Sequence, residues 1–122
     1  TFKPFVYTAA IDNGWSPYET FVDDSVHIVD DIGNVWSPGN SGAMTGLPMT
    51  LREGLARSKN TITAQLIEQV GPSEAAFYAR RMGITSSLDE VYSLALGTSD
   101  VKLLDLTSAY STFANGGLLL FA

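Results

Sequence analysis

The chain has 122 residues and a net charge of −6 at pH 7, with 45% hydrophobic and 16% charged residues. This composition is typical of a globular domain, or of part of one, and excludes a disordered chain. The seven basic residues are scattered, which argues against nucleic acid as a partner because phosphate binding needs clustered lysine and arginine. With no cysteine and one histidine, the sequence predicts neither a disulfide framework nor a metal site, and we expect no cofactor.

The N-terminal segment, residues 2–12, is predicted to be a helix. Its apolar residues recur at spacings of three and four positions: Phe2, Phe5, Val6, Ala9 and Ala10. Pro4 is tolerated only in the first turn, so the helix must begin close to Thr1. Asn13-Gly14 supplies the stop.

Residues 15–49 lose the helical period. Three prolines and four glycines punctuate this segment. Val26–Val29 is compatible with a short strand, and the rest is expected to be a long ordered loop region. A loop of this length inside a compact domain is usually functional or packed over another part of the domain.

Helices are predicted again from residue 50. Thr50 followed by Glu53 is a capping-box signature that opens a helix over 51–57. A second helix is expected over 61–70, where an apolar face ends at Gly71-Pro72.

The remaining segments give weaker signals. A helix should begin at Ser73 and end at Gly83, with Phe77 as its apolar anchor. A short helical turn is compatible with 88–92. The longest helix is expected over 100–114, and 118–121 is predicted to open a strand.

Two short motifs are candidates for chemistry. Thr1-Phe2-Lys3-Pro4 opens the first helix, and Ser58-Lys59-Asn60 lies at the junction between two later helices. With their surroundings they resemble the transpeptidase domain of penicillin-binding proteins, of the class A, bifunctional type. The similarity runs along almost the whole chain in the family's order, through Phe5, Tyr7-Thr8-Ala9-Ala10, Trp36-x-Pro38-x-Asn40, Leu51-Arg52-Glu53-x-Leu55-Ala56, Leu94-Ala95-Leu96-Gly97 and Ala109-Tyr110-x-Thr112-Phe113-Ala114-Asn115-Gly116-Gly117. Gly54 departs from the pattern, because alanine is more usual there and is a better helix former.

The resemblance implies roles for individual residues. The family carries its nucleophile in Ser-x-x-Lys, a second serine in Ser-x-Asn, and Lys-Thr-Gly on a strand. Lys3 is then the motif lysine, and the nucleophilic serine is expected immediately before Thr1, outside this sequence. Ser58 and Asn60 match the second motif, so Lys3, Ser58 and Asn60 are the implied catalytic residues. Asn60 and Trp36 are the implied substrate-binding residues, and Lys-Thr-Gly is expected beyond the last residue.

The spacings fit acyl-transfer chemistry. A serine three residues before Lys3 would lie on the same helix face, one turn away. A desolvated lysine loses its proton near neutral pH and can act as a base toward that hydroxyl. Ser58 could hydrogen-bond Lys3 and relay a proton to the leaving amine. Asn60, with a donor and an acceptor, suits the backbone of a peptide substrate.

The family resemblance also implies fold and function. We expect a mainly α fragment, the helical part of the α+β transpeptidase and serine β-lactamase-like fold, with the central sheet largely missing. Residues 1–122 would be one piece of a peptidoglycan D,D-transpeptidase at the extracytoplasmic face of the bacterial membrane. Its partners would be stem peptides, β-lactam antibiotics and the remaining segments of the parent domain. The isolated chain is expected to be inactive, and a non-catalytic helical interaction module is the alternative.

Structural roles compete with these functional ones. Lys3 could be a solvated lysine at a helix start, and Ser58 and Asn60 could simply end one helix and cap the next. Trp36 and Trp15 could line a groove or cover the loop region.

His27 with Asp23 or Asp30 raises the hypothesis of a Ser-His-Asp triad, for which a structural histidine is the favoured alternative. The four aspartates of this loop could suggest calcium, but the EF-hand spacing is absent and a solvated acidic loop is favoured.

Overall fold

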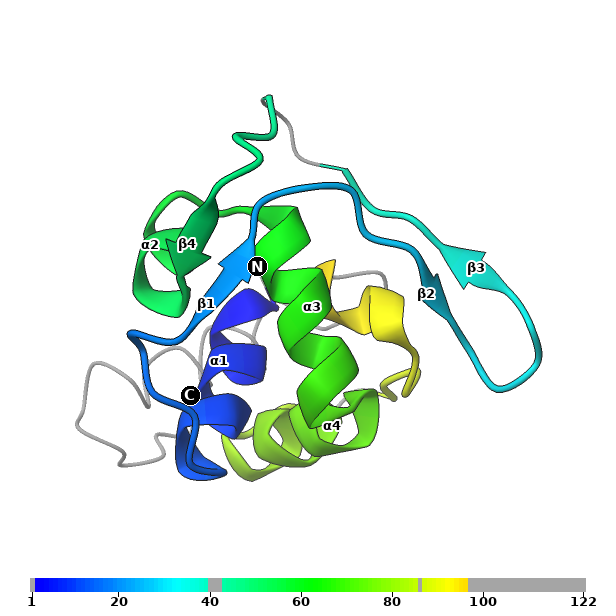
Figure 1. Ribbon diagram of the computed structural model, residues 1–122. Helices are drawn as coiled ribbons and strands as arrows, with labels where there is room; N and C mark the ends of the chain where they lie inside the picture. Colours follow the sequence, from blue (N-terminus) through cyan, green and yellow to red (C-terminus); the bar gives the residue numbers. More distant parts are fainter. Residues whose placement is uncertain (1, 40–42, 86, 97–122) are drawn as a thin grey trace.

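The computed structural model describes residues 2–39, 43–85 and 87–96. Its elements, in chain order, are α1 (Lys3–Asp12), β1 (Thr20–Val22), β2 (Ile28–Val29), β3 (Val35–Trp36), β4 (Pro48–Thr50), α2 (Leu51–Ala56), α3 (Asn60–Val70), α4 (Pro72–Arg81) and the 3-10 helix η1 (Tyr92–Leu96) (Figure 1). The expectation of a mainly helical fragment is confirmed. None of the helices in these ranges is both long and apolar enough to cross a bilayer.

Helix α3 is the centre of the fold. It packs against α1, α2, α4 and η1, and Figure 1 shows it between α1 and η1 with α4 crossing below. The main core is formed by large apolar side chains with almost no exposed surface, including Phe2, Phe5, Val6, Leu66, Ile67 and Leu94. Each such side chain contributes about 1.5–3 kcal/mol of burial free energy, so α1 and α3 are held together strongly.

Helix α1 forms as predicted. Pro4 lies in its first turn, where a missing N–H costs nothing. At the other end, the Asn13 side-chain amide donates to Ala9 O at 2.7 Å. Gly14 follows with φ of +98°, a conformation that favours glycine, so the chain leaves the helix there.

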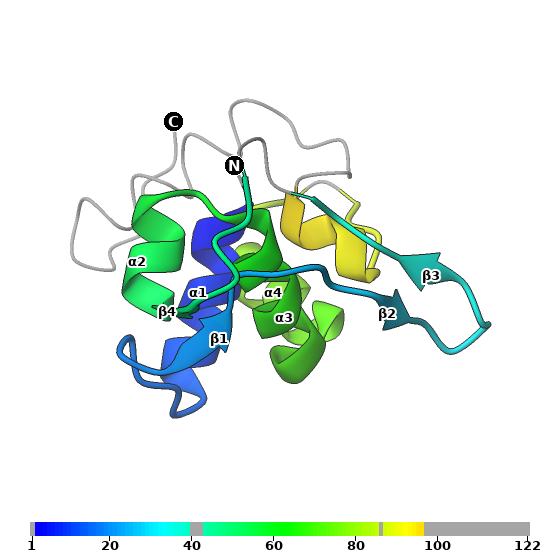
Figure 2. The ribbon, with the colours of Figure 1, turned by 45° about the horizontal axis from the view of Figure 1, so that its top comes forward.

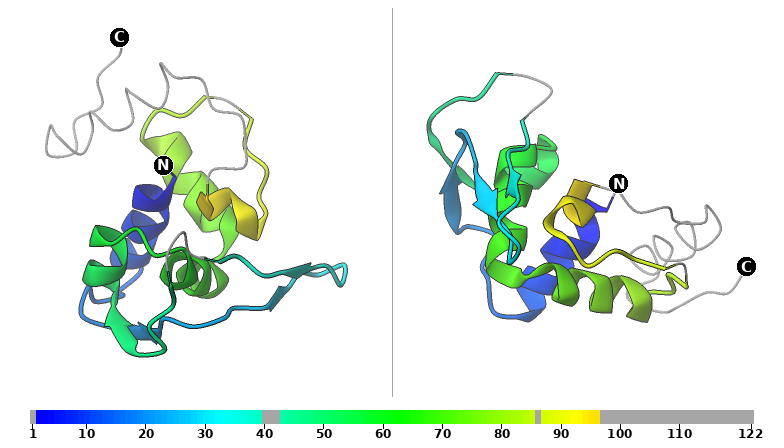
Figure 3. Two further views of the ribbon diagram at one scale, coloured as in Figure 1. Left: turned by 90° about the horizontal axis from the view of Figure 1, so that it is seen from above. Right: turned by 90° about the vertical axis from the view of Figure 1, so that its right-hand side faces the viewer.

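The segment expected as a long loop contains two small antiparallel sheets. Strand β1 pairs with β4, with Phe21 opposite Met49, and β2 pairs with β3, with Ile28 opposite Trp36. The predicted short strand corresponds to β2, but β1, β3 and β4 were not predicted. Figures 2 and 3 show the β2–β3 hairpin extending away from the helices, while β1 and β4 lie beside α2.

Helices α2, α3 and α4 begin at or within one residue of the predicted positions. Thr50 Oγ1 accepts a hydrogen bond from Glu53 N at 3.1 Å, which confirms the predicted cap of α2. Helix α3 ends at Gly71, whose φ is +95°, and α4 begins directly afterwards at Pro72.

Two expectations for the later segments are wrong. Phe77 is not the anchor of α4, because 47% of its surface is exposed. The buried face of α4 is formed by alanines, Ala75, Ala76 and Ala79, whose small side chains let α4 lie close to α1. The helical turn expected over 88–92 is a 3-10 helix over Tyr92–Leu96 instead. The helix expected over 100–114 and the strand over 118–121 lie outside the described residues.

Candidate active site

Ser58 occupies a strained position at the end of α2. Its backbone is left-handed, with φ of 53°. Ser58 N donates to Leu55 O at 3.0 Å, and Lys59 N donates to Gly54 O at 2.8 Å. This pair of hydrogen bonds defines a Schellman motif, in which glycine normally occupies the left-handed residue. A serine there costs about 1–2 kcal/mol, and strained positions of this kind cluster at functional sites.

Lys3 lies directly against this serine. Lys3 Nζ donates to both Ser58 O and Ser58 Oγ at 2.9 Å, although 55 positions separate the two residues in the chain. Only 8% of the Lys3 surface is exposed, and this burial lowers the pKa of Lys3 below its usual 10.5. Ser58 itself is exposed, so the contact joins a buried amine to a residue that solvent or a ligand can reach.

Asn60 follows at the first position of α3 and is half-buried. Its side-chain amide donates to Gly39 O at 2.8 Å. The hydrogen bond ties the segment after β3 to the start of α3. The two motif residues therefore contact different segments. Ser58 contacts Lys3 of α1, and Asn60 contacts the loop at Gly39.

Lys59, the middle residue of the motif, turns toward a buried carboxylate. Its Nζ lies 3.3 Å from Asp23 Oδ2 and donates to Ala43 O at 3.2 Å. Asp23 has no exposed surface and also accepts from Thr61 Oγ1 at 2.6 Å and from Thr45 N at 3.0 Å. Sequence reasoning missed this cluster. A buried charge needs partners, and those of Asp23 come from elsewhere in the fold, so no local pattern in the sequence could have identified the cluster.

The triad hypothesis finds no support in these contacts. His27 Nδ1 lies 2.7 Å from Ser37 Oγ, whereas Asp23 is engaged as described above. Asp30 Oδ1 accepts from the backbone N–H groups of Ile32 and Asn34 within the β2–β3 turn. Among the described residues, no group of three histidine, aspartate or glutamate side chains is arranged to hold a metal ion.

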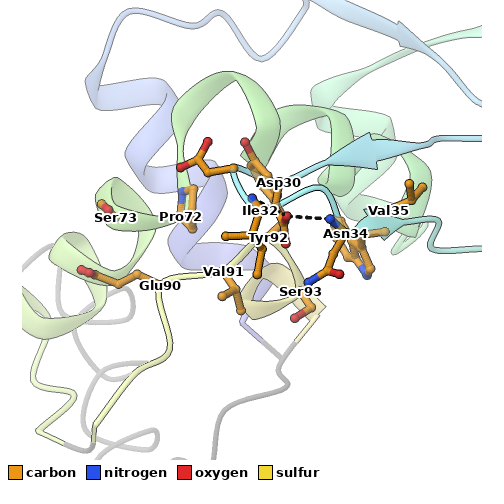
Figure 4. Close-up of a pocket in the computed structure, with 12 residues that line it drawn as sticks. Asp30, Ile32, Asn34, Val35, Pro72, Ser73, Glu90, Val91, Tyr92 and Ser93 are labelled. Atoms are coloured by element: carbon orange, nitrogen blue, oxygen red, sulfur yellow. Dashed lines mark hydrogen bonds between the residues drawn. The ribbon is translucent and has the colours of Figure 1, made fainter.

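Trp36 is half-buried and packs against both apolar clusters of the core. It lines a hollow of about 600 Å³ between the β2–β3 hairpin, the start of α4 and η1 (Figure 4). Lys3, Ser58 and Asn60 are not among the described lining residues, so this hollow is separate from the Lys3–Ser58 contact. Trp15 packs on Phe21, with ring centroids 5.7 Å apart, and covers the core.

The motifs, the fold and the Lys3–Ser58 contact point to one family. A model of the penicillin-binding protein transpeptidase domain matches residues 1–120 of the chain. The chain belongs to the penicillin-binding protein transpeptidase family. Penicillin-binding protein 1A of Neisseria meningitidis is 41% identical to it over 121 residues, and that of Pseudomonas aeruginosa is 36% identical over 119 residues. The match covers 96% of this chain in both cases but spans only 15% and 14% of those relatives.

Solved structures agree with this penicillin-binding protein assignment. Penicillin-binding protein 1A from Haemophilus influenzae superposes with a TM-score of 0.87 at 34% identity, over 97% of this chain and 18% of that one. Penicillin-binding protein PonA1 from Mycobacterium tuberculosis shares the fold, with a TM-score of 0.85 at 23% identity over 98% of this chain and 34% of that one. The class A resemblance and the expected fold class are both confirmed.

Proposed function

We propose that this chain is the part of a peptidoglycan D,D-transpeptidase that supplies the general base and the proton relay. The observation that carries the proposal is the contact of Lys3 Nζ with Ser58 Oγ at 2.9 Å, inside the predicted pair of motifs. Lys3 is the base, Ser58 the relay, and Asn60 a ligand for the backbone of the donor peptide. Trp36 is a weaker candidate for substrate contact.

The reaction begins with a serine immediately before Thr1. Its hydroxyl oxygen attacks the carbonyl carbon of a D-alanyl-D-alanine peptide bond, while Lys3 Nζ takes the hydroxyl proton. The C–N bond of the tetrahedral intermediate then breaks. A proton passes from Lys3 through Ser58 Oγ to the departing nitrogen, which leaves as the amine of D-alanine. The products of this half-reaction are an acyl-serine and free D-alanine.

The second half-reaction cross-links two stem peptides. The amine of an acceptor peptide attacks the acyl-serine, a new C–N bond forms, and the C–O bond to serine breaks. The amine proton returns to the serine oxygen through Lys3. A β-lactam that resembles D-alanyl-D-alanine would acylate the same serine and leave it blocked. PonA1 from Mycobacterium tuberculosis has been solved in complex with penicillin V, which supports β-lactams as ligands of the family.

The geometry at Lys3 suits a base. A neutral amine has two N–H groups and one lone pair. Ser58 O and Ser58 Oγ accept two hydrogen bonds from Nζ, so the lone pair of a neutral Lys3 is left for the serine proton. Burial favours that neutral form because it disfavours charge.

The activity needs more than these residues. The nucleophile and the strand with Lys-Thr-Gly are expected outside the sequence, so the 122 residues alone should not be acylated. The complete enzyme would act at the extracytoplasmic face of the bacterial membrane. The alternative is a non-catalytic helical interaction module. Such a module would have the same fold, but it would not require Lys3 as a base.

Acylation by a labelled penicillin separates the two functions. A complete transpeptidase domain that contains these residues should gain the mass of one penicillin on the serine before Thr1. Lys3→Ala should slow that step by about 100-fold or more, because general-base catalysis contributes about 10²–10⁴-fold. Arg80→Gln, which removes an exposed ion pair with Glu90, is the matched control and should react at the parent rate. A parent domain that is never acylated would support the interaction module. A Lys3→Ala variant as fast as an acylated parent would instead remove Lys3 from the proposed role of base.

A further inference from the structure

Ser58 is held in place partly by groups that never touch Lys3. Its Schellman turn fixes the backbone through Leu55 O and Gly54 O, but the next residue, Lys59, is drawn toward Asp23. Lys59 also carries the first hydrogen bonds of α3, because its carbonyl accepts from both Thr63 N and Thr63 Oγ1 at 3.2 Å. The orientation of Lys59 therefore sets both the end of the Ser58 turn and the start of α3.

Asp23 contacts this junction at two points. Its Oδ2 lies 3.3 Å from Lys59 Nζ, and its Oδ1 accepts from Thr61 Oγ1 at 2.6 Å. Lys59 directly follows Ser58, and Thr61 directly follows Asn60. The Asp23 carboxylate therefore contacts the residue after Ser58 and the residue after Asn60.

Asp23 is also held by the segment that precedes β4, through its carboxylate and through its backbone. Thr45 N donates to Asp23 Oδ2 at 3.0 Å, Gly46 N donates to Asp23 O at 2.8 Å, and Asp23 N donates to Leu47 O at 3.0 Å. Ala43 O shares the Lys59 ammonium at 3.2 Å. Asp23 has no exposed surface, and the Lys59 side chain is only 14% exposed. An ion pair with so little solvent around it is geometrically restrictive and costly to break.

We propose that Asp23 is a positioning residue for the transpeptidase, one that holds the Ser58-Lys59-Asn60 turn against Lys3 through Lys59 and Thr61. The inference rests on the proposed function and extends it to a residue on a different segment. Asp23 touches neither Lys3 nor the reacting atoms through any of these contacts. Its effect is to keep Ser58 Oγ within 2.9 Å of Lys3 Nζ, in a backbone conformation that serine does not favour. Displacing a catalytic group by about 1 Å can cost about 100-fold in rate.

Two measurements on a complete transpeptidase domain test the proposal. The first is the penicillin acylation rate of Asp23→Asn, which keeps the shape of the side chain and removes its charge. We expect a loss of about 10- to 100-fold. The second is hydrogen exchange at the amides of Ser58 and Lys59, which report the Schellman turn. In Asp23→Asn these two amides should lose protection while the amides of α4 keep theirs.

One milder variant covers the case in which Asp23→Asn fails to fold. Thr61→Val removes one donor to Asp23 at nearly constant volume and leaves the Asp23–Lys59 ion pair in place. It should slow acylation by about 3- to 10-fold and raise exchange at Ser58 and Lys59, the same direction as Asp23→Asn. Arg80→Gln, which removes an exposed ion pair with Glu90, should change neither measurement.

The outcomes separate this inference from the proposed function. If the parent domain is not acylated, the proposed function fails, and hydrogen exchange still decides whether Asp23 holds the turn. If the variants keep the parent rate and parent protection, Asp23 is not a positioning residue. A uniform loss of protection across α1, α3 and α4 would overturn the proposal too, because it would make Asp23 a general stabiliser of the fold.

Discussion

Gly54 of α2 lies directly against Ile62 of α3. A Cβ atom placed on Gly54 would come within 2.6 Å of Ile62 Cγ2 and 2.9 Å of Ile62 Cβ. Both atoms lie next to the backbone, so Ile62 cannot avoid the contact by rotating the end of its side chain. The close approach explains the glycine at a position where alanine would be the better helix former. The glycine at position 54 is therefore explained by the packing of α2 on α3 and not by helix propensity.

Gly54→Ala should therefore destabilise the domain. Overpacking of this kind costs about 1–3 kcal/mol, against about 1 kcal/mol gained in helix propensity. We expect a lower urea midpoint for the complete domain. Ile62→Ala should lower the midpoint on its own by leaving a cavity, and the double variant should lose less than the sum of the two. A Gly54→Ala domain more stable than the parent would show that α2 and α3 can separate without cost.

The cap of α2 gives a second prediction. Thr50 Oγ1 accepts from Glu53 N at 3.1 Å, and this bond satisfies one of the free N–H groups at the helix start. Thr50→Ala should lower the free energy of unfolding by about 1 kcal/mol, measured by urea denaturation. Thr50→Ser keeps the hydroxyl and is the matched control. Equal losses in both variants would assign the effect to the β4 pairing with Thr20 instead of the cap.

The elements that the sequence predicted well are those specified by local residues. Pro4 and Asn13-Gly14 bound α1, and Thr50 with Glu53 starts α2, because caps and turns act within a few positions. Strands β1, β3 and β4 have only two or three residues each, too few for an alternating pattern to be recognised. Phe77 was misassigned because an apolar side chain on a helix does not by itself say which face is covered.

The candidate site depends on contacts between distant segments. Residue chemistry alone favoured an ordinary solvated lysine at position 3, and only the family resemblance linked Lys3 to Ser58. The Asp23 cluster could not be predicted, because its partners Thr45, Lys59 and Thr61 lie 22 to 38 positions away. Nothing local to Asp23 distinguishes it from the exposed Asp24 beside it.

Tyr7 carries a buried hydroxyl one helical turn after Lys3. Among the described residues, Tyr7 Oη has no hydrogen-bond partner. The Thr63 side chain is near enough to lower the Tyr7 pKa, but the two groups do not meet the geometry of a hydrogen bond. Burial is the larger effect and raises the pKa of Tyr7 to about 12. A desolvated, unpaired hydroxyl is a cost to the folded state.

Tyr7→Phe should accordingly leave stability unchanged or raise it by up to about 1 kcal/mol near neutral pH. The pH dependence gives a sharper test. The unfolded chain ionises near the ordinary tyrosine pKa of 10, whereas folded Tyr7 ionises near 12, so the folded state loses stability as pH rises through this window. In urea denaturation from pH 9 to 12, the free energy of unfolding of Tyr7→Phe should therefore fall less than that of the parent. A marked destabilisation at pH 7 would reveal a hydrogen bond to Tyr7 Oη.

The pKa of Lys3 also fixes the sign of a pH effect on folding. Burial lowers this pKa below 10.5, so between the lowered value and 10.5 the unfolded state binds more protons than the folded state. The Lys3 contribution to stability therefore becomes more favourable as pH rises through that window. Lys3→Met removes the titrating group and should flatten this part of the stability profile.

The same lowered pKa determines how acylation should respond to pH. If the neutral amine is the base, as proposed above, the rate of acylation by penicillin should rise as Lys3 loses its proton and level off at a pH below 10.5. The acylation rate of the complete domain is measured by intact mass at a series of pH values with constant ionic strength. Ser58→Ala removes one of the two acceptors of Lys3 Nζ, so it should lower the plateau and shift the midpoint of the rise. Arg80→Gln should keep the parent profile. A rate that is independent of pH, or that rises only with the midpoint of a solvated lysine, would remove Lys3 from the role of base.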